Sequence, residues 1–578
     1  MVDMLTIPLK EKLLNEWKLP LITDYIKKWA TITPNNPALV SADTGQTYTF
    51  KDFDEMVTLY ALRLKKMGIK KGDVVVSQWL AWPEFFMLTY ACATIGAIMT
   101  PLDVRLMSHE VIRDMKKIDP IAFFCLGNTA VRDFRDLVRE VQKTVTTLKY
   151  IVQLTPGGGK QDLLEGCLDF EEHFAPAALE ELKQDNKLIE SLRQEYYALN
   201  TRDPHIIIFT TGSTGIPKPA LICHENTLTN NAVFSREVGL YGTDNRYLNS
   251  MPTSHVAGTC QGPMTVWFTG GTVISLSMYN PQAVLKNIEK YRPTWWGGVP
   301  TMFRMLWSDP NYDSYDLSSL RYILYGGSAV DVPFLEKMAT MAPTFGTSLG
   351  MTECAGYFTA TPRGISLEEM AGQVGQIFPE YAPVTIRKPM NEDGTAGEEL
   401  PIGEVGEICV HGPIVFLGYY NDPEATAATI SKEGILYTGD MGYFHDFGSY
   451  LGLKFAGRRK FVIKPKGYLV FPDEVTDYIS RHPKVAQAQV LGLPHDIFVD
   501  GVFAFVQPKP GEDLKPEEIM EYCKNMAAYK RPIHVEIWPV SEPFPLTRVG
   551  KVDVPALIEA GKKVVEKLRA EGKWDRSK

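Results

Sequence analysis

Short apolar runs alternate with longer segments of helical spacing through the first part of this 578-residue chain. DVVVSQW and PIAFFCLG have the length and composition of buried strands. LITDYIKKWATI and DFDEMVTLYALRLKKMG repeat apolar residues at helical spacing, and the second ends on Gly68, a typical residue after a helix C-terminus. A second run of strands, TVISLS, PTWWGGVP, YILYGG and TSLGMTE, lies further along. The pattern predicts an α/β fold with largely parallel sheets.

The character of the sequence changes after Gly397, where GEVGEICVHGP and FLGYYNDPEAT are short β-rich segments with frequent turn signals. A basic segment, GRRKFVIKPKG, is followed by a compact βαβ-like pattern of AQAQVLGLP, GVFAFVQPK, PEEIMEYCKNM and HVEIWPV. The chain exceeds the size of one hydrophobic core, and this last stretch is long enough for a small domain. We therefore expect a boundary at about Phe455 to Lys460, and a solvated, charged helix with a frayed end in the C-terminal tail.

Charge and hydropathy exclude two classes of protein. A formal net charge of -9 leaves no basic surplus for phosphate backbones, so we expect no nucleic acid partner. The longest uncharged run, Phe85 to about Leu102, has the length of a membrane span. It contains polar residues and ends in Pro101, which favours a buried helix that runs into a strand.

The cysteines and the first residues bear on the compartment. The eight cysteines are scattered, with no C-x-x-C pair, which is typical of reduced thiols and not of a disulfide or zinc framework. The start, MVDMLTIPLKEKLLNEW, is charged and lacks the apolar core and cleavage site of a signal peptide. We expect a cytoplasmic protein. No feature of the sequence indicates the oligomeric state, and a homodimer stays an open alternative.

The segment TTGSTGIPK, residues 210–218, directly follows the strand-like HIIIF. Backbone N–H groups, hydroxyls and a lysine in one loop suit phosphate oxygens. The P-loop pattern requires G-x-x-x-x-G-K-[ST] and a following helix, but here the two glycines are closer and PALICHE reads as another strand. The segment therefore predicts a strand–loop–strand element that binds phosphate, with a plain surface hairpin as the alternative.

Six further motifs follow in order: MPTSHVAG, YGGSAV, GMTE, YTGD, GRRKFVIKPKG and PLTRVGK. Each is weak alone. Together with TTGSTGIPK, over nearly the whole chain, they resemble the adenylate-forming superfamily of acyl- and aryl-CoA synthetases, firefly-type luciferases and nonribosomal peptide synthetase adenylation domains. The chain looks most like an AMP-forming medium-chain or aryl acyl-CoA synthetase.

The resemblance implies a two-step ligase that uses ATP, Mg²⁺ and coenzyme A. A carboxylate attacks the α-phosphate of ATP to give acyl-adenylate and pyrophosphate, and a thiol then expels AMP; such transfers depend on positioning and charge neutralisation. It also implies two αβαβα-type subdomains and a β-rich subdomain in a large N-terminal domain, residues 1–457. A small mobile α+β lid, residues 458–578, would turn on a hinge near residue 460.

The resemblance assigns residues to the nucleotide. Lys218, Thr352, Glu353 and Lys551 would be catalytic, with Glu353 helping to hold Mg²⁺ and Lys551 bridging the carboxylate and the α-phosphate. The nucleotide-binding set is Thr210, Thr211, Gly212, Ser213, Thr214, Gly215, Gly326, Gly327, Ser328, Leu349, Gly350, Met351, Asp440 and Arg458. Within this set Asp440 would take the ribose hydroxyls.

The acyl and thiol sites follow in the same way. His255, Val256, Gly258 and Gly350 would line the acyl pocket, His255 as a gate, although a histidine after a proline turn is most often structural. Lys460, Lys464 and Gly467 would form the hinge and the coenzyme A approach. Gly467 leaves the room that a Cβ would take from the pantetheine arm.

Several positions depart from the family pattern. The residue before Gly350 is usually aromatic and here is Leu349, which predicts a weaker contact with adenine. Pro219 replaces a glycine, Phe461 replaces an acidic residue after the hinge, and no basic residue follows Lys551 closely. These departures leave nucleotide affinity and domain motion open.

The substrate is narrowed by elimination against the family. Val256 stands where amino-acid-activating domains carry an aspartate, which argues against free α-amino acids as substrates. Gly350 stands where acetate-specific members carry a tryptophan, which favours a medium-chain, branched, alicyclic or aromatic acid. No carrier domain follows, which favours free coenzyme A. A stand-alone adenylation enzyme that loads a carrier protein, and an inactive nucleotide-binding relative, are the alternatives.

Overall fold

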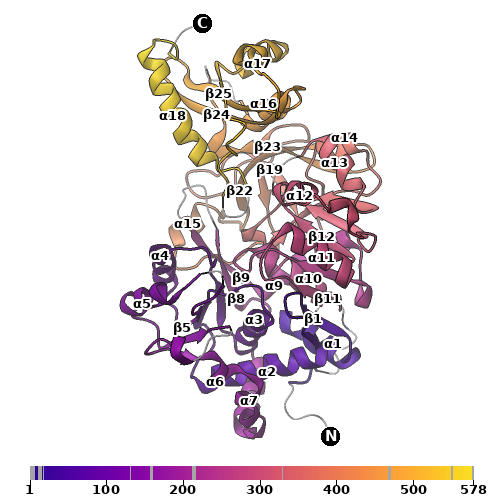
Figure 1. Cartoon of the computed structure of the whole chain (residues 1–578), viewed down its shortest axis with the longest axis vertical. Helices are drawn as coiled ribbons and strands as arrows, with labels where there is room; N and C mark the ends of the chain where they lie inside the picture. The colour runs from indigo at the N-terminus through magenta and orange to yellow at the C-terminus, as the bar shows by residue number, and fades with distance from the viewer. Residues whose placement is uncertain are drawn as a thin grey trace. The chain divides into compact units, whose positions relative to one another are not determined.

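The computed structural model describes residues 7–10, 16, 19–130, 132–156, 160–210, 217–327, 330–465, 470–547 and 551–575 (Figure 1). The chain divides into two compact units. Unit 1 comprises Met1–Pro383 and Val410–Leu436, and unit 2 comprises Val384–Cys409 and Tyr437–Lys578. The predicted domain boundary after residue 457 stays a prediction, because unit 2 also includes β-rich segments that precede it.

The first sheet of unit 1 has eight strands in the order β21-β9-β8-β4-β3-β5-β6-β7. Their bounds are β3 Val74–Ser77, β4 Ile98–Pro101, β5 Ala122–Leu126, β6 Tyr150–Leu154, β7 Leu168–Asp169, β8 Pro204–Thr210, β9 Lys218–Cys223 and β21 Gly418–Tyr419. The strands from β8 to β7 in this order are parallel, whereas β9 is antiparallel to both β8 and β21.

The second sheet of unit 1 has seven strands in the order β14-β13-β12-β10-β11-β1-β2. Their bounds are β1 Pro37–Ser41, β2 Thr47–Thr49, β10 Arg246–Asn249, β11 Thr272–Ser275, β12 Trp295–Gly298, β13 Tyr322–Tyr325 and β14 Thr344–Thr347. All neighbours are parallel except β1 and β2. The predicted α/β class with largely parallel sheets is confirmed.

Helices lie between the strands of unit 1 along the chain, and several provide the crossover connections that parallel neighbours require. They are α1 Ile22–Ile32, α2 Phe50–Lys66, α3 Pro83–Ile95, α4 Ser108–Ile118, α5 Arg135–Thr144, α6 Phe170–Phe174, α7 Pro176–Leu179, α8 Asn186–Tyr197, α9 His224–Val238, α10 Gly262–Phe268, α11 Pro281–Tyr291, α12 Pro300–Trp307, α13 Val332–Ala339, α14 Leu367–Ala371 and α15 Pro423–Ala427. The uncharged run at Phe85 is indeed the buried helix α3 followed by strand β4. No helix in the described ranges is long and apolar enough to cross a membrane.

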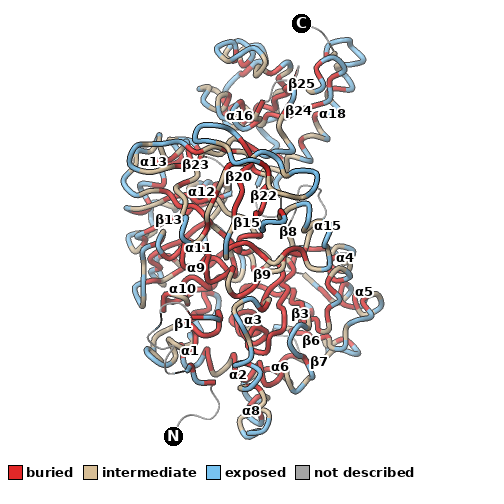
Figure 2. The backbone as a smooth tube through the Cα atoms, turned by 180° about the vertical axis from the view of Figure 1, so that it is seen from behind, coloured by how far each residue is buried: buried red, intermediate tan, exposed pale blue. Residues whose placement is uncertain are grey.

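Each sheet of unit 1 carries its own core (Figure 2). On the first sheet, Val111 and Met115 of α4 and Val138 of α5 pack against Val76 and Phe123 of the strands. On the second sheet, α11, α12 and α13 cover a cluster that includes Trp296 and Ile323. Each large apolar side chain buried in this way stabilises the fold by roughly 1.5–3 kcal/mol, so the strand ends at the sheet edges are held firmly.

Four neighbouring strands of a six-stranded sheet lie mainly in unit 2, in the order β23-β22-β20-β19. These strands are β19 Val384–Arg387, β20 Gly406–Val410, β22 Leu436–Asp446 and β23 Leu451–Arg458. The β-rich character predicted after Gly397 is confirmed. Strands β22 and β23 are antiparallel, and their register places Asp440 opposite Arg458.

The C-terminal part of unit 2 contains β24 Val485–His495, β25 Val499–Pro508 and β26 His534–Ile537, with α16 Pro472–Ser480, α17 Pro516–Tyr522 and α18 Val554–Ala570. Strands β25 and β26 are parallel and flank α17 in the chain, which confirms the predicted βαβ pattern. Alternate residues of β25 face two cores: Val502, Ala504 and Val506 lie in the core with α16 and α17, and Phe503 and Phe505 in the core with α18.

The prediction of a solvated tail with a frayed end is wrong in part. Helix α18 forms, but Leu557 and Val565 are buried against β24 and β25 together with Trp574. The indole N–H of Trp574 donates to the carbonyl of Pro494 at 2.8 Å. Charged residues outnumber apolar ones in the tail, so its sequence gives little sign of the narrow apolar stripe that packs against the sheet. All eight cysteines are free, as predicted.

Candidate active site

The predicted phosphate loop joins two antiparallel strands. Thr210 at the end of β8 pairs with Lys218 at the start of β9, which confirms the strand–loop–strand prediction; a P-loop would be followed by a helix and not by a strand. The loop residues Thr211, Gly212, Ser213, Thr214 and Gly215 lie outside the described residues. The carbonyl of Pro217 accepts from Nζ of Lys117 at 2.5 Å, which ties the loop exit to α4.

Tyr419 connects two of the predicted catalytic residues. Its ring lies under Nζ of Lys218, 5.0 Å from the ring centroid, and its hydroxyl donates to Oε1 of Glu353 at 2.7 Å. Burial, followed by the charge of Glu353, raises the pKa of the Tyr419 phenol, so the hydroxyl stays protonated and keeps donating. Sequence reasoning missed Tyr419. The only signal was that FLGYYND resembled a strand, and the pairing of β21 with β9 is what carries the phenol to this place.

Glu353 is also held through its backbone. It lies in a 3-10 turn, Thr352–Cys354, and its carbonyl accepts from the N–H of Phe416 at 2.9 Å. The residue is buried, with 6% of its surface exposed, so its carboxylate is fixed among protein atoms and not in bulk water. Thr352 and Glu353 follow β15, Gly350–Met351, directly in the chain.

Tyr357 fills the space that Gly350 leaves. Strand β15 pairs with β16, Gly356–Tyr357, so Gly350 lies opposite Tyr357. A Cβ on Gly350 would lie 2.5 Å from Cδ1 of Tyr357 and 2.5 Å from the carbonyl oxygen of Gly356. Glycine is therefore needed here for close packing. The role of Gly350 in the acyl pocket stays a prediction, and the ring of Tyr357, a residue outside the predicted set, lies beside the glycine.

The same tyrosine reaches another predicted glycine. A Cβ on Gly326 would lie 2.5 Å from the Tyr357 hydroxyl. The amide of Asn230, on α9, donates to the Tyr357 carbonyl at 2.7 Å. Burial raises the pKa of Tyr357 to about 12, although a hydrogen bond with Gln261 lowers it in part. Gly326, Gly350, Tyr357 and Asn230 therefore form one packed group.

The predicted residues of the second sheet share its carboxyl edge. His255 follows β10, Gly326 and Gly327 follow β13, and Leu349 follows β14. Parallel α/β sheets bind ligands at this edge. Gly327 has a φ of 89°, a conformation that favours glycine. Ser328 lies outside the described residues, and Met351 lies on β15 beside Gly350.

His255 begins a short 3-10 turn, Val256–Gly258. Its Nδ1 accepts from the N–H of Ala257 at 3.1 Å, so that this nitrogen carries no proton in this arrangement. Val256 is buried, and a Cβ on Gly258 would lie 2.2 Å from the carbonyl oxygen of Pro252. The histidine therefore has a capping role in the structure, beside which its role as a gate stays a prediction.

A charged group lies in unit 2 around Arg458. Nε of Arg458 lies 2.7 Å from Oδ1 of Asp440, which is 5% exposed. Burial raises the pKa of Asp440 to about 6, while Arg458 and Lys551 favour its charged form and lower the pKa in part. Burial also raises the pKa of Asp473 to about 6, with Arg458 again opposing. Two carboxyl groups that titrate close to neutral pH therefore lie around one guanidinium.

Lys551 belongs to the same group. The residue is exposed, yet desolvation of its ammonium lowers its pKa, with Arg458 lowering it further and Asp440 raising it. The backbone N–H groups of Thr547 and Lys551 each bond across their turn, to the Lys551 carbonyl at 2.6 Å and to Oγ1 of Thr547 at 3.2 Å. The predicted residues Asp440, Arg458 and Lys551 therefore come together.

Glu407 is a second residue that sequence reasoning missed. Its two carboxylate oxygens accept from the N–H of Gly439, at 2.9 Å, and from Nη1 of Arg459, at 2.9 Å. It thereby ties the turn before Asp440 to the predicted hinge. Its position in GEVGEICV gave no sign of this contact, which depends on the pairing of β20 with β22.

The other hinge residues are held nearby in the chain. Nζ of Lys460 lies 4.4 Å from the ring centroid of Phe461, so the aromatic residue that departs from the family pattern provides a cation–π contact. The N–H of Lys464 donates to Oδ2 of Asp500 at 2.9 Å. Gly467 lies outside the described residues.

Two family models match this chain. The AMP-binding enzyme model matches residues 26–420, and the model of the AMP-binding enzyme C-terminal domain matches residues 474–551. The chain belongs to the AMP-binding enzyme family. The first match contains the phosphate loop, His255, Glu353 and Tyr419, and the second ends on Lys551.

Individual relatives agree over nearly the full length. The chain is 28% identical over 551 residues to the putative acyl-CoA synthetase YngI of Bacillus subtilis, covering 91% of this chain and 94% of the relative. It is 28% identical to the mitochondrial medium-chain acyl-CoA ligase ACSF2 of Danio rerio, covering 92% and 86%. The crystal structure of the anthranilate CoA ligase AuaEII in complex with anthranoyl-AMP matches with a TM-score of 0.76 at 21% identity, covering 94% and 98%, which supports the fold.

Proposed function

We propose that this AMP-binding enzyme is an AMP-forming acid–CoA ligase. ATP and a carboxylic acid give acyl-adenylate and pyrophosphate, and coenzyme A then gives acyl-CoA and AMP. The observation that carries the proposal is the contact of both Lys218 and Glu353 with Tyr419, the lysine over its ring and the glutamate at its hydroxyl. Residues 135 positions apart supply a cation and a carboxylate to one place, and nucleotide phosphates with a bound metal require both.

In the first step, the oxygen of the substrate carboxylate attacks the α-phosphorus of ATP as the bond to pyrophosphate breaks. Lys218 and the loop before it would neutralise the departing phosphates, and Lys551 would draw the two anions together. Lys551 and Arg458 bring two cationic groups close together, which favours an anion beside them. Asp440 would accept from the two ribose hydroxyls.

Magnesium is part of the proposal. The Glu353 carboxylate and the Thr352 hydroxyl are hard oxygen donors of the kind that Mg²⁺ prefers. The ion would neutralise phosphate charge.

The acid proposed is larger than acetate: medium-chain, branched, alicyclic or aromatic. Val256 provides no charge for an α-ammonium group, which argues against amino acids. The names of two similar proteins, a medium-chain acyl-CoA ligase and an anthranilate CoA ligase, agree with this range of acids. We propose further that Tyr357, and not Gly350, limits the length of the acid, because its ring occupies the space beside the glycine.

The test is acid-dependent ATP–pyrophosphate exchange across a panel of medium-chain, cyclic and aromatic acids, followed by detection of the coenzyme A thioester. Exchange and thioester formation with the same acid are expected. Exchange without thioester would favour an enzyme that loads a carrier protein. Absence of exchange with every acid would favour an inactive nucleotide-binding relative.

A further inference from the structure

A pocket of about 340 Å³ lies at one edge of the seven-stranded sheet. The candidate active site lies at the other edge. It is lined by Thr243, Asp244, Arg246, Arg292, Thr294, Ser318, Ser319 and Arg321, which we call the arginine pocket. Arg246 begins β10, while Thr294 and Arg321 immediately precede β12 and β13. The pocket is therefore at the amino ends of strands whose carboxyl ends lead to His255 and Gly326, roughly 13 Å away for strands of this length.

The three arginines differ in how their charges are compensated. Nη1 of Arg292 lies 2.6 Å from Oδ2 of Asp316, and Nη2 donates to Ser318 at 3.0 Å, so its charge is neutralised. Nη2 of Arg246 donates to the uncharged carbonyl of Tyr291 at 2.6 Å. Arg321 is exposed and forms no ion pair or side-chain hydrogen bond with any residue that the structure describes.

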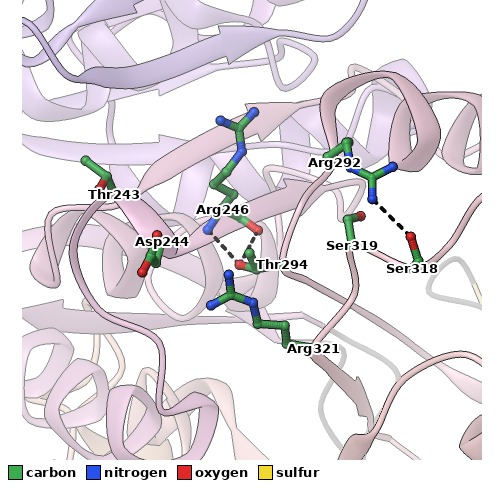
Figure 3. Close-up of a pocket in the computed structure, with 8 residues that line it drawn as sticks. All are labelled: Thr243, Asp244, Arg246, Arg292, Thr294, Ser318, Ser319 and Arg321. Atoms are coloured by element: carbon green, nitrogen blue, oxygen red, sulfur yellow. Dashed lines mark hydrogen bonds between the residues drawn. The ribbon is translucent and has the colours of Figure 1, made fainter.

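Figure 3 shows Thr294 beside the backbone of Arg246 and near the side chain of Arg321, with Arg292 directed toward Ser318. The Thr294 hydroxyl is occupied by the backbone of Arg246, accepting from its N–H at 2.9 Å and donating to its carbonyl at 3.2 Å. This bond fixes the floor of the pocket. Oγ of Ser319 is buried and has no hydrogen-bond partner among the described residues.

The charge of the lining is positive. Arg246 is half-buried, and burial lowers its pKa with no acidic neighbour to oppose the effect. A guanidinium that has lost water without gaining a carboxylate is short of an anion. Asp244 is the one carboxylate of the lining, and it is exposed. Two arginine charges therefore remain against one negative charge.

We propose that the arginine pocket binds a phosphomonoester that carries hydroxyl groups. Guanidinium groups recognise phosphate by paired, charge-assisted hydrogen bonds, and the hydroxyls of Thr243 and Ser319 add donors. The volume exceeds that of a phosphate alone and reaches the range of small-molecule sites. Asp244 disfavours a second phosphate but accepts hydrogen bonds from ligand hydroxyls. This site is separate from the proposed site of ATP and acid.

The experiment uses the full chain and sn-glycerol 3-phosphate, a phosphomonoester with two hydroxyls, titrated at millimolar concentrations by calorimetry at constant ionic strength. Binding is expected for the wild type, and glycerol is expected not to bind. Arg321→Gln should weaken binding about tenfold, since it removes a charge-assisted contact. Inorganic phosphate should bind more weakly than the ester, because Asp244 then has no hydroxyl to accept from.

Lys286→Gln is the matched control, because it removes one exposed positive charge from α11 outside the pocket. It should leave binding unchanged, as should Lys218→Gln in the predicted phosphate loop. Thermal unfolding of each variant verifies that it is folded. No binding by the wild type, equal binding by Arg321→Gln, or loss in Lys218→Gln but not in Arg321→Gln would each overturn the proposal.

Discussion

The charged residues of the candidate site are held in opposite ways in the two units. In unit 1, Lys218 and Glu353 are each in contact with Tyr419, through its ring and its hydroxyl. Unit 2 contains a close group of charged residues: Asp440, Asp473, Arg458 and Lys551. Burial raises the pKa of both aspartates and lowers the pKa of the lysine, and each shift favours the neutral form. In unit 1 the charged groups have partners within the protein. In unit 2 the buried charges are held at a cost in free energy that a bound ligand would lower.

The difference suggests a division of labour. A residue with its partners in place positions a ligand, and its removal disturbs geometry. A charge that is buried at a cost is poised for a reaction step, because a ligand of opposite charge lowers the cost of holding it. Loss of the Lys551 charge in unit 2 should therefore act on chemistry, and perturbations of unit 1 on binding and selectivity.

The largest effect is expected for Lys551→Ala. Losing the cation that joins carboxylate and α-phosphate should slow acid-dependent pyrophosphate exchange by about 10³-fold. Thioester formation from synthetic acyl-adenylate should change little, since that step begins after the phosphate chemistry. Measuring both half-reactions checks this, and equal loss of both would contradict the assignment of Lys551 to adenylation alone.

Tyr357→Ala should change which acids react. Removing the ring vacates the space beside Gly350, so the ratio of kcat/KM for a longer acid to that for a shorter one should rise by about ten- to a hundredfold. Tyr357→Phe keeps the ring and should leave the ratio near that of the wild type. An unchanged ratio in the alanine variant would show that Tyr357 does not limit the acid.

Tyr419→Phe tests the scaffold of unit 1. The ring under Lys218 stays, but Glu353 loses a hydrogen bond to a charged group, which should lower kcat/KM for exchange about tenfold. Raising the magnesium concentration should restore part of the loss if Glu353 holds the ion. Tyr420→Phe is the neighbouring control and should behave as wild type; an equal loss there would remove the special role of Tyr419.

The smallest effect is expected from pH. Because the pKa of Asp440 is raised to about 6, the carboxylate is ionised at pH 7.5 and half protonated near pH 6. Its ability to accept from both ribose hydroxyls should therefore fall as pH falls, and the KM for ATP should about double near pH 6. This rise in the KM for ATP near pH 6 should persist in Asp473→Asn. Its disappearance there would assign the titration to Asp473.

Lowering the pH should weaken ATP binding but should raise the free energy of unfolding. A raised pKa means that ionisation of Asp440 opposes folding, so its unfavourable contribution grows as pH rises from the unfolded value of 3.8 toward about 6. Asp440→Asn should consequently raise the free energy of unfolding at pH 7, with the gain fading below pH 4. Denaturant unfolding at the two pH values provides the measurement.

Local pattern was enough to predict much of the fold. The apolar period of DFDEMVTLYALRLKK specifies helix α2, and HIIIF followed by a glycine- and hydroxyl-rich loop and PALIC specifies the β8–β9 hairpin. The polar residues and terminal proline of the uncharged run distinguished helix α3 from a membrane span. These features depend on residues close in sequence, and the burial of one face is imposed by the period itself.

The sequence by itself also determined which residue types the site contains, because seven ordered motifs name Lys218, Glu353, Asp440 and Lys551. Only the tertiary structure decided what surrounds them. Tyr419 meets Lys218 and Glu353 because β21 pairs with β9, and Tyr357 meets Gly350 because β16 pairs with β15. Register between strands and burial of charges are collective properties of the packed chain, and neither leaves a periodic signal in the residues that they bring together.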